Sequence, residues 1–347
     1  MSDDVFSQLN GIEVVEAITP ETFKDRILPR EQPVVLKGVV ADWPIVRLAQ
    51  QSDEAAADYI ASCDIGRPAQ TLLGDPSIKG EFFYGDDLNR FNFQKGTVPI
   101  PVALRRMLDQ RSEARPYAVY IQSTPIEEYL PRFLEDHRLP ILPPDVLPRI
   151  WIGNQLRVQT HYDLFSNVAC VAAGKRRFTL FPPDQLANLY PGPLDKTIAG
   201  PPVSMASIEN PDFERYPRFA EALKHAQTAE LEPGDGIYIP YFWWHQVRSL
   251  EPFNVLVNYW WDDNPPGLGL PFDALLHGLL ALRDLPPARR RAWKAMFDYF
   301  VFGEQGEPMA HLKPEDRGPL GSLNEDQRRG FYVQLVRNLE AQWSDKA

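Results

Sequence analysis

Cysteine, leader-like segments and long apolar runs are scarce in this chain. It has two cysteines in 347 residues, Cys63 and Cys170, which are too few for a disulfide framework. No uncharged apolar run approaches the ~20 residues that span a membrane, and the first residues carry neither the basic nor the apolar segment of a signal peptide. We therefore expect a cytoplasmic protein with no membrane partner.

A strongly basic surface pattern is also missing. The net charge is −11 at pH 7, and lysine and arginine cluster only in short runs at residues 175–177 and 289–291. Proteins that bind phosphate backbones present extended basic stripes or patches. We therefore expect no nucleic-acid partner, and we interpret the run at 289–291 as the solvated face of a helix.

Proline, by contrast, is abundant, with 34 residues spread throughout the chain. Because 44% of residues are hydrophobic and 24% are charged, the composition is that of an ordinary globular protein. The prolines therefore indicate short strands and many loops. We divide the chain into an N-terminal α/β segment that packs on the core (1–114), a β-rich core (115–265) and a C-terminal helical region (266–347).

The core is expected to consist of short strands. Residues 168–172 form an apolar run, and after Gly174 residues 177–181 are interpreted as its hairpin partner. A long excursion follows at 184–229. Short strands at this spacing favour a sandwich or barrel. The further strands are expected at 150–152, 235–240, 245–249 and 253–260, and N-terminal elements at 33–40 and 117–122 (strands) and at 53–63, 102–111 and 125–135 (helices).

The pattern becomes helical after Pro266. Residues 272–282, 288–302 and 324–343 carry apolar residues at three-and-four spacing, which predicts amphipathic helices. The last helix has an apolar stripe, which either packs on its own core or forms a homodimer interface. Its members are Phe331, Leu335, Val336, Leu339 and Trp343.

The candidate chemistry begins at His161 and Asp163. They follow an apolar strand pattern, and residues two apart on a strand point to the same face. An imidazole and a carboxylate on one face can chelate a metal ion. A second imidazole from another strand would complete a facial triad with open positions, which is typical of non-haem Fe(II) oxygenases.

His245 is the best candidate for that third ligand. It follows a tight-turn signal at residues 233–236 and a short apolar strand, and aromatic residues precede it directly. We therefore predict a metal site, and a catalytic centre, at His161, Asp163 and His245.

Motifs across residues 115–262 resemble the JmjC/cupin-like 2-oxoglutarate oxygenases, in the same order and at similar spacing. Within that family the pattern is most similar to the asparaginyl hydroxylases that act on hypoxia-inducible factor. The resemblance implies a mainly β fold with a double-stranded β-helix (jelly-roll) core, Fe(II) and 2-oxoglutarate. The motifs are residues 160–163, Asn167, residues 177–185 and 189–191, residues 233–235 and 243–245, and residues 258–260.

The resemblance also assigns roles around the metal. Arg176 falls where the family usually has a lysine that pairs with 2-oxoglutarate, and Lys175 stands next to it. A guanidinium can meet a carboxylate through two parallel hydrogen bonds. Gln122 matches a substrate-contacting position. The remaining cosubstrate positions are Tyr120, Asn167 and Asn258, and the threonine that often precedes the metal-binding histidine is matched only by Thr160.

These assignments predict an Fe(II)- and 2-oxoglutarate-dependent dioxygenase that hydroxylates a protein side chain or a small molecule and releases succinate. The alternative is a non-catalytic metal-binding cupin that acts as an interaction module. The resemblance further implies a homodimer formed through the C-terminal helices.

Overall fold

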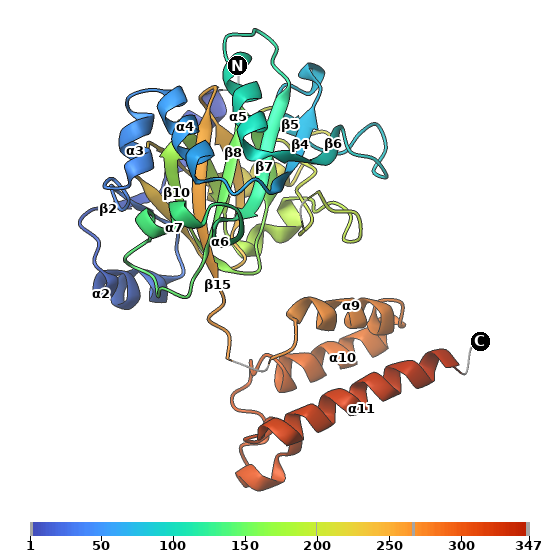
Figure 1. Cartoon of the computed structure of the whole chain (residues 1–347). Helices are drawn as coiled ribbons and strands as arrows, with labels where there is room; N and C mark the ends of the chain where they lie inside the picture. The colour runs from blue at the N-terminus through green and yellow to red at the C-terminus, as the bar shows by residue number, and fades with distance from the viewer. Residues whose placement is uncertain (1–2, 199, 266–267, 345–347) are drawn as a thin grey trace. The chain divides into compact units, whose positions relative to one another are not determined.

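The computed structural model describes residues 3–198, 200–265 and 268–344. The chain divides into two compact units, Met1–Asp263 and Asn264–Ala347 (Figure 1). Residues 266–267 and 345–347 of the predicted C-terminal region lie outside the described residues. Over the described ranges, no helix combines the length and the apolar character needed to cross a membrane.

Two β-sheets build the first unit. The mainly β, jelly-roll core expected from the sequence is confirmed. Sheet A runs in the order β1 (Asn10–Gly11), β12 (Gln227–Leu231), β11 (Arg176–Phe181), β14 (Trp244–Ser249), β9 (Arg157–His161) and β5 (Glu81–Phe82). Sheet B runs in the order β2 (Glu13–Val15), β3 (Val34–Leu36), β13 (Gly236–Ile239), β10 (Ser166–Ala173), β15 (Asn254–Trp261), β8 (Pro148–Gly153), β7 (Ala118–Pro125), β4 (Pro68–Gly74) and β6 (Phe93–Pro99).

Strand β10 separates two apolar cores. Every residue of the strand is buried, and successive side chains alternate between its faces. Ala169 and Val171 pack in the same cluster as Phe178 of β11, between the sheets. Val168 and Cys170 pack in the cluster that includes the helices. Burial on both faces explains why this strand is a continuous apolar run in the sequence.

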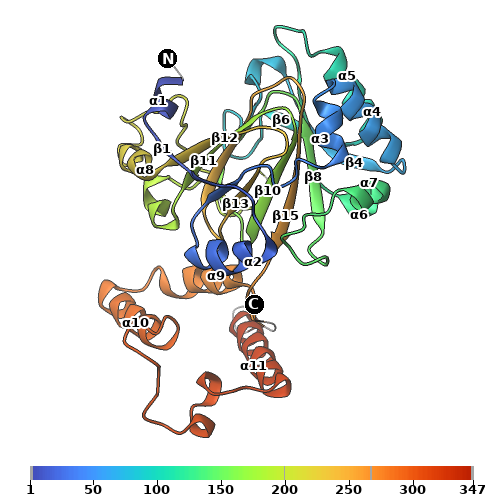
Figure 2. The same cartoon turned by 90° about the vertical axis from the view of Figure 1, so that its left-hand side faces the viewer.

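Helices cover the outer face of sheet B. Figure 2 shows α3 to α7 on one side of the sheets, with α1 (Asp3–Ser7) and α8 (Phe219–His225) on the other. The helix expected at 53–63 is confirmed as α4, and it begins there because the Ser52 hydroxyl accepts the Ala55 N–H at 3.0 Å. The covering helices are α3 (Pro44–Ala49), α4 (Asp53–Cys63), α5 (Ile100–Asp109), α6 (Ile126–Tyr129) and α7 (Pro131–Asp136).

Two sequence predictions about these elements are wrong. β10 and β11 do not pair, because β10 bonds to β13 and β15 in sheet B whereas β11 bonds to β12 and β14 in sheet A. The turn at Gly174 reverses the chain but carries it into the other sheet. The single helix expected at 125–135 is divided at Leu130, whose φ of −136° is non-helical. Pro131 disfavours a helical conformation at the residue before it.

The first 99 residues supply strands at both ends of sheet B. β2 and β3 extend it beyond β13, and β4 and β6 extend it beyond β7. Lys37 and Asp235 reinforce one junction, with Nζ and Oδ2 2.8 Å apart. Strands from distant parts of the sequence thus form one continuous sheet.

The second unit contains the three helices expected from the periodicity, which are α9 (Pro271–Leu282), α10 (Pro287–Phe300) and α11 (Glu325–Ser344). None of its side chains that the structure describes is buried. In the predicted stripe, Phe331, Leu335 and Val336 are 41%, 46% and 52% exposed, and Leu339 is half-buried. The side chain of Trp343 lies outside the described part. This unit therefore presents apolar surface instead of enclosing it.

His137 is a buried histidine in the helix layer, and we predict that it makes folding sensitive to acid. Its Nδ1 donates to the Phe133 carbonyl at 2.7 Å, and its Nε2 accepts the Ile45 N–H at 3.3 Å, so the ring is neutral. Burial lowers the pKa of His137 from 6.5 to about 4. The unfolded chain therefore binds the proton first, and stability falls as the pH drops from 6.5 towards 4, by up to about 3 kcal/mol.

Urea unfolding of wild type and His137→Gln between pH 7 and pH 4.5 measures this contribution. The variant is expected to lose less stability over that interval than the wild type, while His225→Gln, at an exposed position, behaves as wild type. Equal losses in wild type and His137→Gln would contradict the prediction.

Candidate active site

His161 and His245 meet across two neighbouring strands of sheet A. His161 is the last residue of β9, and His245 is the second residue of β14. The strands are antiparallel and these two residues are direct partners in the register. Their ring centroids lie 4.4 Å apart. Cross-strand pairing therefore brings two imidazoles together although 84 positions separate them in the sequence.

Asp163 joins the pair from a loop, and our assumption that it lies on the same strand as His161 is wrong. β9 ends at His161. The carboxylate Oδ2 of Asp163 is 3.6 Å from Nε2 of His245. One ligand atom from each of the three residues can be chosen so that all lie within 4.8 Å of one another. The arrangement has the donor set of a 2-His-1-carboxylate metal site.

An irregularity in β9 turns His161 inward. The register between β14 and β9 shifts between Val247 and His245, opposite Val158 and His161. Val158 and His161 are three positions apart, yet both line the same cavity. Regular alternation cannot place Val158 and His161 on one face. The extra residue of β9 between them therefore sets the direction in which the His161 side chain points.

Backbone carbonyls orient both imidazoles. Nδ1 of His161 lies 2.8 Å from the Gln159 oxygen, and Nδ1 of His245 lies 3.0 Å from the Trp243 oxygen. Because a carbonyl only accepts, each Nδ1 carries the proton and each Nε2 is left as the metal-binding atom. Burial lowers the pKa of His245 to about 4. The neutral ring is the form that binds a metal.

An aromatic clamp, formed by Tyr162, Phe242 and Trp244, joins the two ligand-bearing segments. The ring of Phe242 stacks on Tyr162 at 4.4 Å, and Tyr162 meets Trp244 edge-on at 4.8 Å. The Phe242 N–H donates to the Asp163 carbonyl at 3.2 Å. Phe242 has a left-handed φ of +66°, which is uncommon for a bulky residue. The surrounding contacts stabilise this strained conformation.

Phe242→Ala is expected to weaken metal binding roughly tenfold, in the range seen when groups that orient metal ligands are removed. Alanine and phenylalanine bear a similar left-handed backbone cost, so the change isolates the lost ring contact. Competition for Fe(II) or Co(II) with a chelator measures the affinity. Phe213→Ala, at a position that is 46% exposed, is the control. Wild-type affinity in Phe242→Ala would contradict a positioning role for the clamp.

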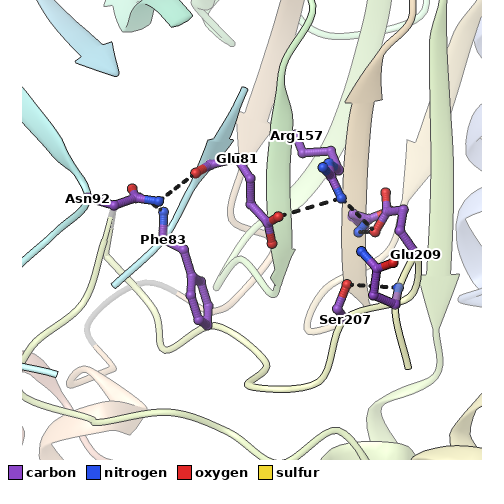
Figure 3. A network of polar contacts seen from close by, with 8 residues as sticks. Glu81, Phe83, Asn92, Arg157, Ser207 and Glu209 are labelled. Carbon is purple, nitrogen blue, oxygen red and sulfur yellow. Dashed lines mark hydrogen bonds and ion pairs between the residues drawn. The ribbon is translucent and has the colours of Figure 1, made fainter. Parts of the chain in front are cut away.

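Arg157 of β9 and Gln246 of β14 both contact Glu209, and Figure 3 shows the part of this network around Arg157. Arg157 begins β9 and lies between two carboxylates, 3.5 Å from Glu81 Oε2 and 3.6 Å from Glu209 Oε2. Gln246, next to the candidate ligand His245, donates to Glu209 at 3.1 Å. Burial raises the pKa of the Glu81 carboxyl. The sequence does not predict this network, since Glu209 lies in the excursion and no local pattern relates it to β9.

Arg176 is a buried cation without an acidic partner among the described residues. It is 1% exposed, and a guanidinium NH₂ makes a long hydrogen bond, 3.5 Å, to the Trp151 carbonyl. Its Nε has no partner within the described ranges. Burial lowers the pKa of Arg176, and the nearby Tyr120 hydroxyl opposes that change. A bare buried charge is costly, so this position favours an anionic ligand.

Lys175 cannot take the same role. Its side chain is 46% exposed, and its Nζ lies 2.8 Å from Glu232 Oε1. Lys175 lies just outside β11, which begins at Arg176. Of the two candidates left open by the sequence, Arg176 is therefore the one that reaches the interior.

A cavity joins Arg176 to the candidate metal ligands His161, Asp163 and His245, which we call the metal-ligand cluster. We call it the metal cavity. Trp151 and Trp260, which the sequence analysis did not assign, also line it. The sequence did contain a signal for Trp260. Residues two apart on a strand share a face, so Trp260 lies on the same face of β15 as Asn258. The predicted residues that line the metal cavity are His161, Asp163, His245, Arg176, Tyr120, Asn167 and Asn258.

The two tryptophans connect the metal-ligand cluster to the asparagines. Trp260 Nε1 donates to Asp163 Oδ2 at 3.2 Å, the same oxygen that faces His245. Trp151 Nε1 donates to Asn258 Oδ1 at 2.6 Å, and Asn258 Nδ2 donates to Asn167 Oδ1 at 3.2 Å. The site therefore has a supporting layer of hydrogen bonds around its ligands.

Gln122 and Thr160 lie outside the metal cavity. Gln122 lines a second cavity next to it. Thr160 is among the lining residues of neither cavity, and its buried hydroxyl has no hydrogen-bond partner within the described residues. Its carbonyl accepts the Ser204 N–H at 2.7 Å, which ties the excursion to β9. The structure thus does not bring Thr160 to the predicted cosubstrate site.

Comparison with known proteins assigns this fold to a family. A family model described as a cupin-like domain matches residues 20–266. This chain belongs to the cupin-like domain family. The match covers the strands that carry the metal-ligand cluster and the strands that line the cavities. It ends close to the boundary between the two compact units.

Relatives of this cupin-like protein differ in their named activities. It is 28% identical to the tRNA wybutosine-synthesizing protein 5 of Gallus gallus, over 72% of this chain and 77% of that protein. It is 27% identical to human HSPB1-associated protein 1, over 81% of this chain and 58% of that protein. It is 38% identical to the lysine-specific demethylase JMJ31 of Arabidopsis thaliana, but only over 33% of this chain and 20% of that protein. The narrower resemblance to asparaginyl hydroxylases stays a prediction.

Proposed function

We propose that this cupin-like protein is an Fe(II)- and 2-oxoglutarate-dependent dioxygenase. The observation that carries the proposal is Arg176, a buried cation whose cavity also holds two imidazoles and a carboxylate. 2-Oxoglutarate is a dianion, with a keto acid at one end that can chelate a metal and a carboxylate at the other. The cavity offers a partner for each end.

The metal would be held by His161 and His245 through Nε2 and by Asp163 through its carboxylate. Two nitrogens and one oxygen suit Fe(II), and three protein ligands leave other coordination positions for ligands that are not part of the chain. Trp260, through its bond to Asp163 Oδ2, fixes the carboxylate in one orientation. When bound, the iron with 2-oxoglutarate and dioxygen supplies the oxidising chemistry that converts a C–H to a C–OH, with release of succinate and CO₂.

Arg176 would pair with the distal carboxylate of 2-oxoglutarate. Tyr120 lines the same cavity, and burial raises the pKa of its phenol to about 12, so the hydroxyl stays protonated and donates a hydrogen bond. Trp151, Phe178 and Leu256 complete an apolar lining that limits the access of water. A dry cavity strengthens the attraction between the guanidinium and a carboxylate.

The substrate is proposed to be a protein side chain or a small molecule. One relative is named for tRNA modification, but the net charge of −11 here opposes binding of a polyanion. The resemblance to asparaginyl hydroxylases favours a protein side chain, and one relative is named a lysine-specific demethylase. We therefore expect hydroxylation whether the substrate is a protein side chain or a small molecule. Residues outside the metal cavity would determine which substrate binds.

Anaerobic loading followed by exposure to oxygen tests the proposal. Protein with Fe(II) and 2-oxoglutarate is expected to release succinate in the presence of oxygen, slowly without substrate and faster with it. Zn(II) in place of Fe(II) is the control and should give none. Iron retention without 2-oxoglutarate binding or any succinate would contradict the proposal and favour the non-catalytic metal-binding cupin.

We also propose that the protein forms a homodimer through its C-terminal unit. A helical unit whose described side chains are all at least partly exposed leaves its apolar surface uncovered in a single chain. Leu275, Leu280, Trp293 and Phe302 are among the exposed residues of this unit, in addition to the stripe on α11. A two-fold interface is self-complementary, so one apolar surface serves both copies.

Replacing Leu335 and Leu339 with glutamate is therefore expected to give a monomer, because the charges would be buried in the interface without partners. Light scattering at micromolar concentration measures the mass, and Gln334→Glu on the same helix is the control. A wild-type protein that is already monomeric under these conditions would exclude the homodimer.

A further inference from the structure

A second cavity adjoins the metal cavity, and we call it the outer cavity. Tyr120, Val158 and His161 line both. On the far side the outer cavity is bounded by Ile198 and Val203 of the excursion. It therefore borders the proposed metal on the side of His161 and is enclosed by a segment that plays no part in holding the metal.

The outer cavity has no acidic side chain among its described lining residues. Apart from His161 and two glutamines, its lining is apolar or aromatic. A cation is close instead, because Lys95 Nζ donates to the Ile198 carbonyl at 2.9 Å. A positively charged group that entered would lose its hydration and find no counter-ion.

Aromatic rings do not replace the missing carboxylate. A cation binds over the open face of a ring. Tyr120 stacks with Phe82 at 6.0 Å and with Trp151 at 5.9 Å, so its faces lie against other rings. Phe82 in turn meets Phe93 at 5.2 Å with the planes nearly perpendicular. The aromatic residues of this lining are packed against one another and do not form a cage for an ammonium group.

Two carboxamides supply the hydrogen-bonding capacity of the outer cavity. Gln159 is 5% exposed, and its side chain makes no hydrogen bond within the part of the chain that the structure describes. Gln122, half-buried, has none there either. An amide side chain without a partner in the protein keeps both its donor and its acceptor capacity. Both groups are therefore free to bond to a ligand.

We propose that the outer cavity binds the reacting part of the substrate as an uncharged, mainly apolar group whose polar end is held by Gln159 and Gln122. It excludes an N-methylated ammonium, the kind of group on which a lysine demethylase acts. Gln159 is then a specificity-determining residue, and the substrate class differs from the one named for the JMJ31 relative. This inference rests on the proposed function, because the substrate is placed beside a metal held by His161.

Binding of two matched probes tests the proposed preference of the outer cavity for an uncharged group. Protein loaded with Zn(II) and 2-oxoglutarate is titrated with pentanamide and with pentyltrimethylammonium, and saturation-transfer NMR reports binding. Pentanamide is expected to bind, and pentyltrimethylammonium to give no signal at the same concentration. Gln159→Leu is expected to raise the Kd of pentanamide roughly three- to tenfold, the effect of one lost hydrogen bond. Gln94→Leu, at an exposed position on β6, is the control and should leave the Kd unchanged.

Three results would each overturn the inference. The first is ammonium binding as tight as amide binding, and the second is a pentanamide Kd that neither Gln159→Leu nor Gln122→Leu changes. The third is absence of pentanamide binding to the wild type. The affinity for 2-oxoglutarate, measured on the same samples, shows whether each variant is folded. Failure of the wild type to bind 2-oxoglutarate would contradict the proposed function, while the comparison of the two probes still stands because neither requires turnover.

Discussion

Asp163→Ala is expected to lower metal affinity by more than about 100-fold, a larger loss than follows removal of a group that only orients a ligand. Asp163 supplies the only negative charge of the proposed triad, and two neutral imidazoles would remain for a dication. The variant also leaves Trp260 Nε1 without its acceptor, which loosens the support of the site. Iron content after gel filtration and succinate release should both fall to background.

Asp86→Ala is the matched control, since the Asp86 carboxylate is exposed and does not line the metal cavity. It should retain the iron content and turnover of the wild type. The aromatic clamp does not depend on the Asp163 side chain, because Phe242 bonds to the backbone carbonyl of that residue. The fold should therefore survive the substitution, and an Asp163→Ala protein with wild-type iron content would refute the triad.

Arg176→Met is expected to have two opposite effects. The KM for 2-oxoglutarate should rise by roughly ten- to a hundredfold, because a hydrogen bond to a charged group contributes about 1.5–3 kcal/mol. The free energy of unfolding of the unliganded protein should increase, because an unpaired buried charge is replaced by an apolar side chain of similar length. A purely structural arginine would give the reverse, a loss of stability with unchanged KM.

Lys175→Met is the control for this pair of measurements. Its ion pair with Glu232 is at the surface, where such pairs contribute about 0–1 kcal/mol. Metal content should stay constant in both variants, which separates loss of the anion site from loss of iron. If Arg176→Met leaves 2-oxoglutarate affinity unchanged, the cosubstrate is not bound by this residue.

Much of the candidate site follows from the sequence because its signals are local. A His-x-Asp pattern after an apolar strand, and a second histidine after a turn, identify three residues that the structure brings together. The site residues Asn167, Asn258 and Arg176 also reach the metal cavity as expected. Each of these predictions needs only the residue type and its place in a motif.

Other features depend on contacts between distant segments, which local patterns do not contain. The irregularity in β9 that turns His161 inward depends on its register with β14. Glu209, Ile198 and Val203 reach the site from the excursion, where no periodicity precedes them. The β10–β11 hairpin was wrongly predicted for the same reason. A turn signal shows that the chain reverses, but it does not show which sheet the next strand joins.

Strand β3, near one end of sheet B, has a consequence for protein synthesis. Leu36 of β3 pairs with Gly236 of β13, so the first strands made must wait for partners made 200 positions later. At ribosomal rates of about 5–20 residues per second, that wait lasts roughly 10–40 s. Until then the nascent chain exposes unpaired strand edges, which promote aggregation. The yield of soluble protein should therefore depend on chaperones that bind the emerging N-terminal strands before β13 and β15 exist.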